Sequence, residues 1–110
     1  MANKYFRKHL TPSANTETAI YTVPDANVSV LSSLRVTNEN AGSATLTVTV
    51  YPLGDATAYR LLKGYVLPTS QTMDVLSGVS CVMQATDVLK VTSTVADVDF
   101  YLSYLEMDRS

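Results

Sequence analysis

The chain has 110 residues, of which 46% are hydrophobic and 16% are charged, and its formal net charge is −2. This length fits one domain, and the composition is too apolar for an intrinsically disordered chain. Thr and Val occur 14 times each, and β-branched residues of this kind favour strands over helices because they pack well on a pleated surface. Composition and spacing alone therefore predict an all-β domain, without indicating what it does.

Several functional classes are disfavoured by what the sequence lacks. No apolar run approaches the 18 residues of a membrane-spanning helix, and polar residues after the basic start argue against a signal peptide. The single Cys81 forms no disulfide within the chain. Residues 1–10 carry three basic and no acidic side chains, whereas the remaining chain carries five basic and ten acidic ones, a net −5. We expect synthesis in the cytoplasm, with no membrane partner and, because the body is acidic, no nucleic-acid partner.

Residues 1–16 are predicted to be a basic N-terminal arm, followed by one domain over residues 17–110. Phe6, Lys8 and Leu10 alternate as in a strand, but so short a segment is also compatible with a helix, in which one face would carry Tyr5, Phe6, His9 and Leu10. Pro12 separates the arm from the domain. The residues expected to dock on a partner are Lys4, Tyr5, Phe6, Arg7, Lys8 and Leu10.

From residue 17 onward the pattern is strand, turn, strand. The predicted strands cover residues 17–23, 28–38, 44–52, 57–62, 65–67, 72–76, 79–85, 88–94 and 98–107, and a turn at Lys63-Gly64 joins the fourth to the fifth. Turn residues recur every eight to twelve positions, which is typical of sandwiches. We predict an antiparallel two-sheet β-sandwich, jelly-roll or immunoglobulin-like, of eight or nine short strands, with no helix longer than about two turns.

Alternation along these strands predicts which side chains form the core. The expected core residues are Val28, Val30, Leu34, Val36, Leu46, Val48, Val50, Val98, Phe100 and Leu102. Four apolar residues fall in the opposite phase: Leu31, Tyr51, Tyr101 and Leu105. Scattered exposed apolar residues are normal, but these four are also what an oligomer interface on the outer faces would look like.

The residues that usually perform chemistry form no recognisable site. Nucleophilic catalysis needs a base beside the nucleophile, and the only His9 lies in the arm while Cys81 lies in an apolar strand. One His and one Cys do not complete a zinc site. Calcium binding by turn carboxylates is an alternative that the sequence leaves open; its candidate ligands are Asp25, Asn27, Asp55, Asp87, Asp97 and Asp99. We predict a non-enzymatic protein without a cofactor.

Three segments resemble small virion structural proteins of tailed bacteriophages, which are β-sandwich proteins of about this length. The matching patterns are the YTVP entry turn at Tyr21–Pro24, VTN at Val36–Asn38, LLKG with LP from Leu61 to Pro68, and SYLE at Ser103–Glu106. The resemblance covers residues 18–106. It implies a non-enzymatic virion protein, similar to the capsid decoration (cement) proteins.

The resemblance also implies partners and a location. A cement protein binds the major capsid protein or another virion protein, and a position on three-fold axes implies a homotrimer. A neck, tail or baseplate component is one alternative. A carbohydrate- or host-receptor-binding β-sandwich module is another, and an aromatic cluster with polar partners at one end of the sandwich would favour it.

Overall fold

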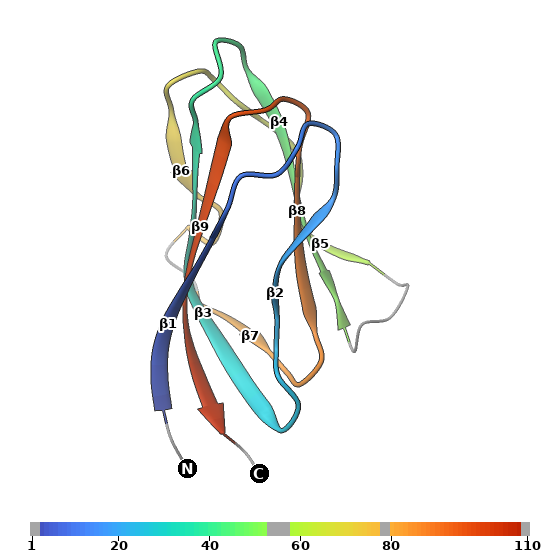
Figure 1. Ribbon diagram of the computed structural model, residues 1–110, viewed down its shortest axis with the longest axis vertical. Helices are drawn as coiled ribbons and strands as arrows, with labels where there is room; N and C mark the ends of the chain where they lie inside the picture. The colour runs from blue at the N-terminus through green and yellow to red at the C-terminus, as the bar shows by residue number, and fades with distance from the viewer. Residues whose placement is uncertain (1–2, 53–57, 78–79, 109–110) are drawn as a thin grey trace.

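The computed structural model describes residues 3–52, 58–77 and 80–108, and Figure 1 shows that these form two opposed layers of strands. Over the described residues there are nine strands and no α-helix, which confirms the predicted antiparallel β-sandwich. The strands are β1 Asn3–Leu10, β2 Thr18–Thr22, β3 Asn27–Asn38, β4 Ala44–Tyr51, β5 Tyr59–Leu67, β6 Thr72–Asp74, β7 Cys81–Met83, β8 Val88–Ser93 and β9 Val98–Asp108.

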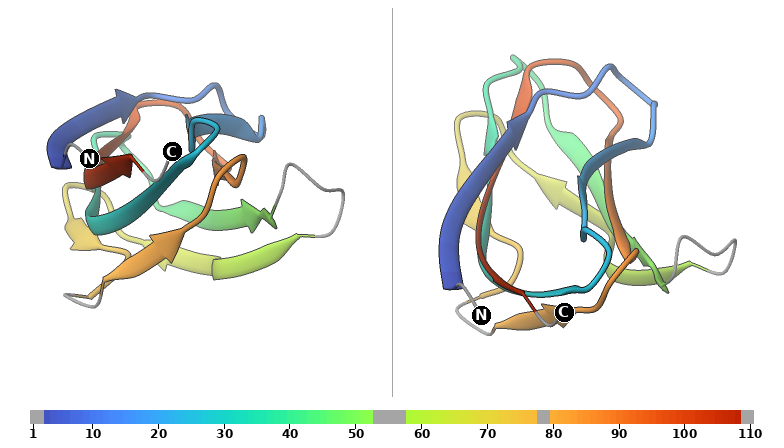
Figure 2. Two further views of the ribbon diagram at one scale, coloured as in Figure 1. Left: turned by 90° about the horizontal axis from the view of Figure 1, so that it is seen from below. Right: turned by 60° about the horizontal axis from the view of Figure 1, so that its bottom comes forward.

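Two antiparallel sheets make up the layers. Sheet A has the order β1-β9-β3-β6, and β7 pairs with β3 beyond the end of β6. Sheet B has the order β2-β8-β4-β5. The edge strands β1 and β2 lie side by side at one flank of the sandwich, and β5, β6 and β7 lie at the opposite flank (Figure 2). Both termini lie at the same end, which we call the terminal end (Figure 1).

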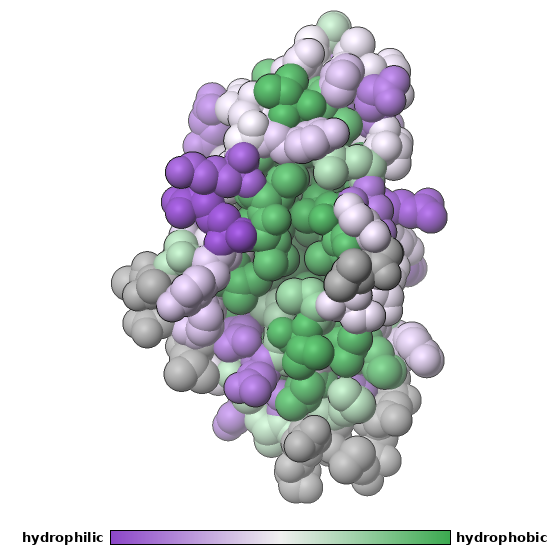
Figure 3. Space-filling view, turned by 180° about the vertical axis from the view of Figure 1, so that it is seen from behind, coloured by the Kyte–Doolittle hydropathy of each residue, from purple (hydrophilic) through white to green (hydrophobic). Residues whose placement is uncertain are grey.

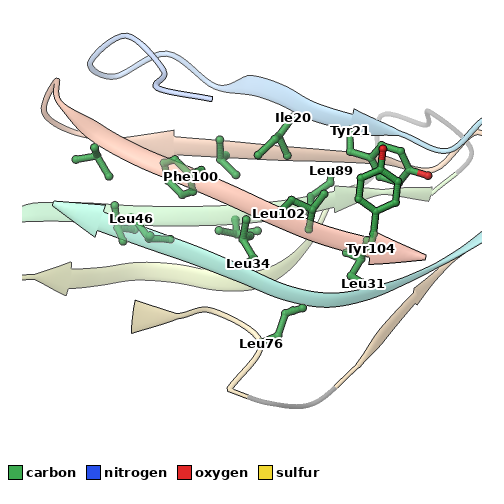
Figure 4. Close-up of a cluster of buried hydrophobic side chains, with 14 of the residues drawn as sticks. Ile20, Tyr21, Leu31, Leu34, Leu46, Leu76, Leu89, Phe100, Leu102 and Tyr104 are labelled. Atoms are coloured by element: carbon green, nitrogen blue, oxygen red, sulfur yellow. The ribbon is translucent and has the colours of Figure 1, made fainter. Parts of the chain in front are cut away.

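The core lies between the sheets and contains most of the predicted residues. The buried members of the predicted set are Leu34, Val36, Leu46, Val48, Val98, Phe100 and Leu102, several of which Figure 4 shows. Val50 is partly buried and packs against this cluster. Strand alternation identified these residues because β4, β9 and the part of β3 after Ser33 each keep one phase along the residues that they contribute.

A β-bulge in β3 overturns the prediction for Val28, Val30 and Leu31. The register against β9 shifts between Leu31 and Ser33, so that two residues of β3 lie opposite one of β9. Side chains before the bulge therefore change face relative to those after it. Leu31 is fully buried and is not an interface residue, whereas Val28 and Val30 face the outside and are only partly buried.

A second irregularity corrects the prediction of two short strands around Lys63-Gly64. The segment is one strand, β5, in which Lys63 and Gly64 together lie opposite Thr47 of β4. Gly64 has φ +64°, a left-handed conformation that glycine adopts without steric cost. The dipeptide is thus a bulge within an edge strand, not a hairpin turn.

The segment expected to be a basic arm is instead the edge strand of sheet A along Asn3–Leu10. Its eight residues pair continuously with β9, from Asn3 opposite Met107 to Leu10 opposite Phe100. Phe6 and Leu10 share the inner face of the sheet with their partners on β9, and the Phe6 ring stacks on Tyr104 with ring centroids 5.7 Å apart. The sandwich therefore includes these residues.

Candidate interaction surfaces

Strand β1 presents aromatic and cationic side chains to the surroundings. Tyr5 is 81% exposed and Phe6 is 42% exposed, and the neighbouring Arg7 and Lys8 are also exposed. Leu10 is half-buried against the core and does not join them at the surface. Lys4 pairs with Glu106 through the backbone, and its side chain lies outside the described part of the structure.

The predicted interface residues do not form one surface. Tyr101 and Leu105 both lie on the outer face of sheet A, and Tyr101 stacks on His9 of β1 at 6.4 Å between ring centroids. Tyr51 lies on sheet B, with its hydroxyl donating to Glu17 at 2.9 Å and Lys90 Nζ 4.7 Å from its ring centroid. The interactions of Tyr51 are thus satisfied within the chain.

Two residues of the outer face of sheet A, Val30 and Val82, could not be assigned to it from the alternation in the sequence. Tyr5, Leu105, Val30 and Val82 occupy successive positions across β1, β9, β3 and β7, and all four face outward. We call these four residues the outer apolar row. Val82 is 63% exposed. Val30 was missed because its place on the outer face depends on the bulge in β3.

The opposite flank carries a second apolar surface. Viewed from that side, Figure 3 shows apolar side chains gathered along a hollow with polar side chains beside it. Leu61 of the edge strand β5 is exposed, and Met73 and Val75 are partly buried, whereas Val66 of β5 lies opposite Thr45 on the outer face of sheet B. Two register shifts interrupt β5, and such bulges make an edge strand a poor template for pairing with another strand.

A cleft of about 540 Å³ opens between β1 and β2 at the terminal end. Phe6, Tyr21 and Tyr104 contribute aromatic rings to its lining, and the Tyr21 and Tyr104 centroids are 4.2 Å apart (Figure 4). Arg7 and Glu106 add charged groups. The cleft is thus an aromatic cluster with polar partners at one end of the sandwich.

A buried hydrogen-bonded network lies beside this cleft. The Tyr21 hydroxyl donates to Glu106 Oε2 at 2.5 Å, and it lies 2.5 Å from Ser29 Oγ. Because the phenol has one proton, the Ser29 hydroxyl donates to the Tyr21 oxygen. Burial, followed by the carboxylate of Glu106, raises the pKa of Tyr21 well above its ordinary value. Tyr21 therefore remains a neutral donor over the accessible pH range.

The two side-chain types considered for nucleophilic catalysis are not brought together. His9 lies on β1 and Cys81 on β7, and strands β9 and β3 of sheet A separate them. Cys81 is partly buried, and this burial raises the pKa of its thiol. The thiol is therefore less ionised at neutral pH than a free cysteine.

The described carboxylates among the candidate calcium ligands do not form a metal site. Within residues 3–52, 58–77 and 80–108, no three side chains of His, Cys, Asp or Glu are grouped so that they could hold a metal ion. Asp55 lies outside the described residues. The same part of the chain contains no helix with the length and apolarity needed to cross a membrane.

Glu39 and Asp99 form a close pair of like charges on the surface. A hydrogen bond between the two carboxyl groups, together with their mutual repulsion, raises the pKa of Glu39 above its ordinary value. Asp99 also accepts a hydrogen bond from Thr11 Oγ1 at 2.6 Å. At neutral pH the pair therefore opposes the native fold slightly.

Replacing Glu39 by Gln is expected to give a small rise in melting temperature at pH 7. The pKa of Glu39 is higher in the folded than in the unfolded chain. The wild-type protein therefore loses stability as the pH rises from the unfolded-state pKa to the folded-state pKa of this carboxyl group. Below the ordinary carboxyl pKa of about 4.3, both states are protonated and the difference should vanish. Thermal melts of both proteins across pH 4 to 8 measure this, and an effect independent of pH would contradict it.

Comparison with known proteins identifies the fold. No protein-family model matches the chain, and no curated protein does so either. Among solved structures, it is similar to a protein of the Bacillus endospore appendages, which are disulfide-linked pili; the identity is 14% and the TM-score 0.62, over 99% of this chain and 88% of that one.

Two viral structures are also similar. A chain of the T13 particle of infectious bursal disease virus matches with 9% identity and a TM-score of 0.55, over 94% of this chain and 30% of that one. A pentameric capsid protein from metagenomic phage sequences matches with 21% identity and a TM-score of 0.44, over 93% of this chain and 59% of that one. At such identities the likeness concerns the fold, a β-sandwich that also occurs in a viral particle and in a pilus.

Proposed function

We propose that this chain is a non-enzymatic structural protein of a virion, and specifically a capsid decoration protein that binds and stabilises the head shell. The observation that carries the proposal is the edge strand β1, where exposed Tyr5 and Phe6 stand beside exposed Arg7 and Lys8. The sequence patterns that resemble tailed-phage virion proteins support it. So does the occurrence of the same fold in a viral particle.

Docking through β1 differs in one respect from docking through a free arm. A free arm would lose conformational entropy on binding, at about 1–2 kcal/mol per residue for the backbone. Strand β1 is already ordered by its eight pairings with β9, so that cost is absent. The cations of β1 then add salt-sensitive attraction to an acidic surface of the major capsid protein or of another virion protein.

Reversing the two described charges of β1 is expected to weaken binding to particles. The double variant Arg7→Glu, Lys8→Glu should bind particles that lack the protein about tenfold or more weakly at low salt, and the wild-type affinity should fall as salt rises. Quantitative mass spectrometry of gradient-purified particles measures the occupancy. The double variant Arg60→Glu, Lys63→Glu on β5 makes the same change in net charge and is the control.

The proposal has clear contrary outcomes. Equal losses for both double variants would mean that net charge, rather than β1, determines binding. Particles that contain none of the protein would remove the virion role altogether. Protein found with purified necks or tails, and not with heads, would favour the neck or tail alternative.

A second candidate function is carbohydrate or receptor binding, which the aromatic cluster beside Glu106 and Arg7 favours. Phe6 is the one exposed ring of this cluster, because Tyr21 and Tyr104 are buried. A single accessible ring offers less stacking surface than glycan sites generally use, so the structural role is the stronger proposal. A glycan array with wild-type protein and Phe6→Ala separates the two, since only a glycan site would give binding that this variant loses.

A further inference from the structure

The two halves of sheet A differ in composition, because toward the terminal end the inner face includes polar side chains beside the buried Leu31 and Tyr104. Away from the terminal end, Leu34 and Leu102 point into the core while Arg35 and Ser103 point outward. Toward the terminal end, the polar Ser29 and Glu106 point inward. There the outward-facing residues of β3 and β9 are apolar, namely Val28, Val30, Leu105 and Met107.

On β3, the bulge between Leu31 and Ser33 causes this change, whereas β9 keeps one phase along its length. Without the extra residue, Val28 and Val30 would continue the inward phase of Leu34, and Ser29 would face water. With it, Ser29 enters the interior, where the Tyr21 hydroxyl satisfies it. The sheet thus keeps a hydrogen-bonded polar network inside and turns Val28 and Val30 outward.

The outward-facing apolar side chains form a continuous patch across four strands. The outer apolar row runs from Tyr5 to Val82, and Met107 and Val28 form a second row beside it. Strands lie about 4.8 Å apart and alternate residues about 6.8 Å apart along a strand. The first row is therefore about 15 Å long, and a one-sided antiparallel sheet would normally place polar residues on such a face.

We propose that this patch binds a second copy of the chain, with the outer faces of the two A sheets packed against each other. A flat sheet face is matched in shape by another sheet face, and aligned sheets pack about 10 Å apart. The patch is smaller than the roughly 800 Å² per partner of a standard stable interface. The contact between the two copies must therefore extend over neighbouring outward side chains such as Tyr101. We expect the dimer to be weak in solution.

Charge selects one orientation of the pair. Residues 1–10 carry +3 and the remaining chain −5, so two β1 strands repel each other while β1 is attracted to the rest of a second copy. A two-fold axis parallel to the strands places β1 of one copy opposite β7 of the other. Tyr5 then packs against Val82 of the second copy, and the cationic strands stay apart.

Sedimentation velocity with the full chain tests this interface. Wild type should associate at tens of micromolar, and Val82→Lys should weaken the association about tenfold or more. Val66→Lys is a matched control, because Val66 is a valine of similar exposure (58%) on β5, opposite Thr45 on the outer face of sheet B. A wild type that stays monomeric to millimolar concentration, or a larger effect of Val66→Lys, would overturn the proposal.

Photo-crosslinking gives a second readout that does not depend on the folding of a lysine variant. Benzoylphenylalanine at position 82 should yield a crosslinked dimer, mapped by mass spectrometry to residues 3–7 of the other copy, and the same group at position 66 should not. No dimer from position 82, or crosslinks from it to β7, would contradict the orientation. The proposed dimer does not depend on a virion role. If the protein self-associates but is absent from purified particles, the dimer is supported and the proposed function is wrong.

Discussion

Val48→Asp is expected to abolish cooperative folding. Val48 is fully buried in β4 and lies between Val91 of β8 and Leu62 of β5 in sheet B. A carboxylate there has no partner, and burying an unpaired charge or shifting its pKa costs several kcal/mol. That loss is comparable with the roughly 5–15 kcal/mol of total stability of a small domain. Far-ultraviolet circular dichroism should show loss of the strand signal, and thermal melts should show no transition.

The matched control for this variant is Thr92→Asp in the adjacent strand β8. Thr92 pairs with Thr47 on the outer face of sheet B and is only partly buried. The same carboxylate at this position remains hydrated and should change stability little. A folded Val48→Asp protein with a transition near that of wild type would show that the assignment of the core is wrong at this strand.

Deleting residues 1–10 is expected to destabilise the sandwich strongly. The deletion removes all eight pairings of β1 with β9, and with them the cover that Phe6 and Leu10 provide for Tyr104 and Phe100. Aromatic side chains bury about 150–250 Å² each at about 25 cal/mol per Å², so the loss amounts to several kcal/mol. It also turns β9, a strand of eleven residues, into an unprotected edge.

Guanidinium unfolding and light scattering measure both consequences of the deletion. The midpoint should fall well below that of wild type, and the truncated chain should aggregate more readily. The charge-reversed variant Arg7→Glu, Lys8→Glu keeps β1 and should unfold close to wild type, which separates the structural role of the strand from its proposed docking role. An unchanged midpoint after deletion would mean that β1 contributes nothing to the fold and is only a tail.

Strand identity was largely predictable because alternation is a local property. Strand β4 reads as alternating apolar and Thr residues, and Leu46 and Val48 are buried as predicted. The all-β class followed from the same pattern repeated along the chain. By contrast, Leu31 was assigned to the wrong face because a bulge adds one residue without leaving a mark in the alternation.

The place of the N-terminal residues was not predictable from the segment itself. Its apolar residues fit a strand or a helix face, and the strand that orders it lies almost 100 positions away, at Val98–Asp108. The composition of the segment, basic and aromatic, nevertheless identified the exposed Tyr5, Phe6, Arg7 and Lys8. Exposure at an edge can be inferred locally, whereas the partner strand cannot.

The two-layer antiparallel β class was predictable from the amino-acid sequence alone, because the period of two in the apolar residues is a local property of each strand. Three features follow from strand pairing and not from alternation: the faces that the bulged strands present, the place of β1 at the edge of sheet A, and the alignment of Tyr5, Leu105, Val30 and Val82 across four strands. These features depend on the register between segments distant in sequence. A shift of one residue in that register exchanges the buried and the exposed face of a strand.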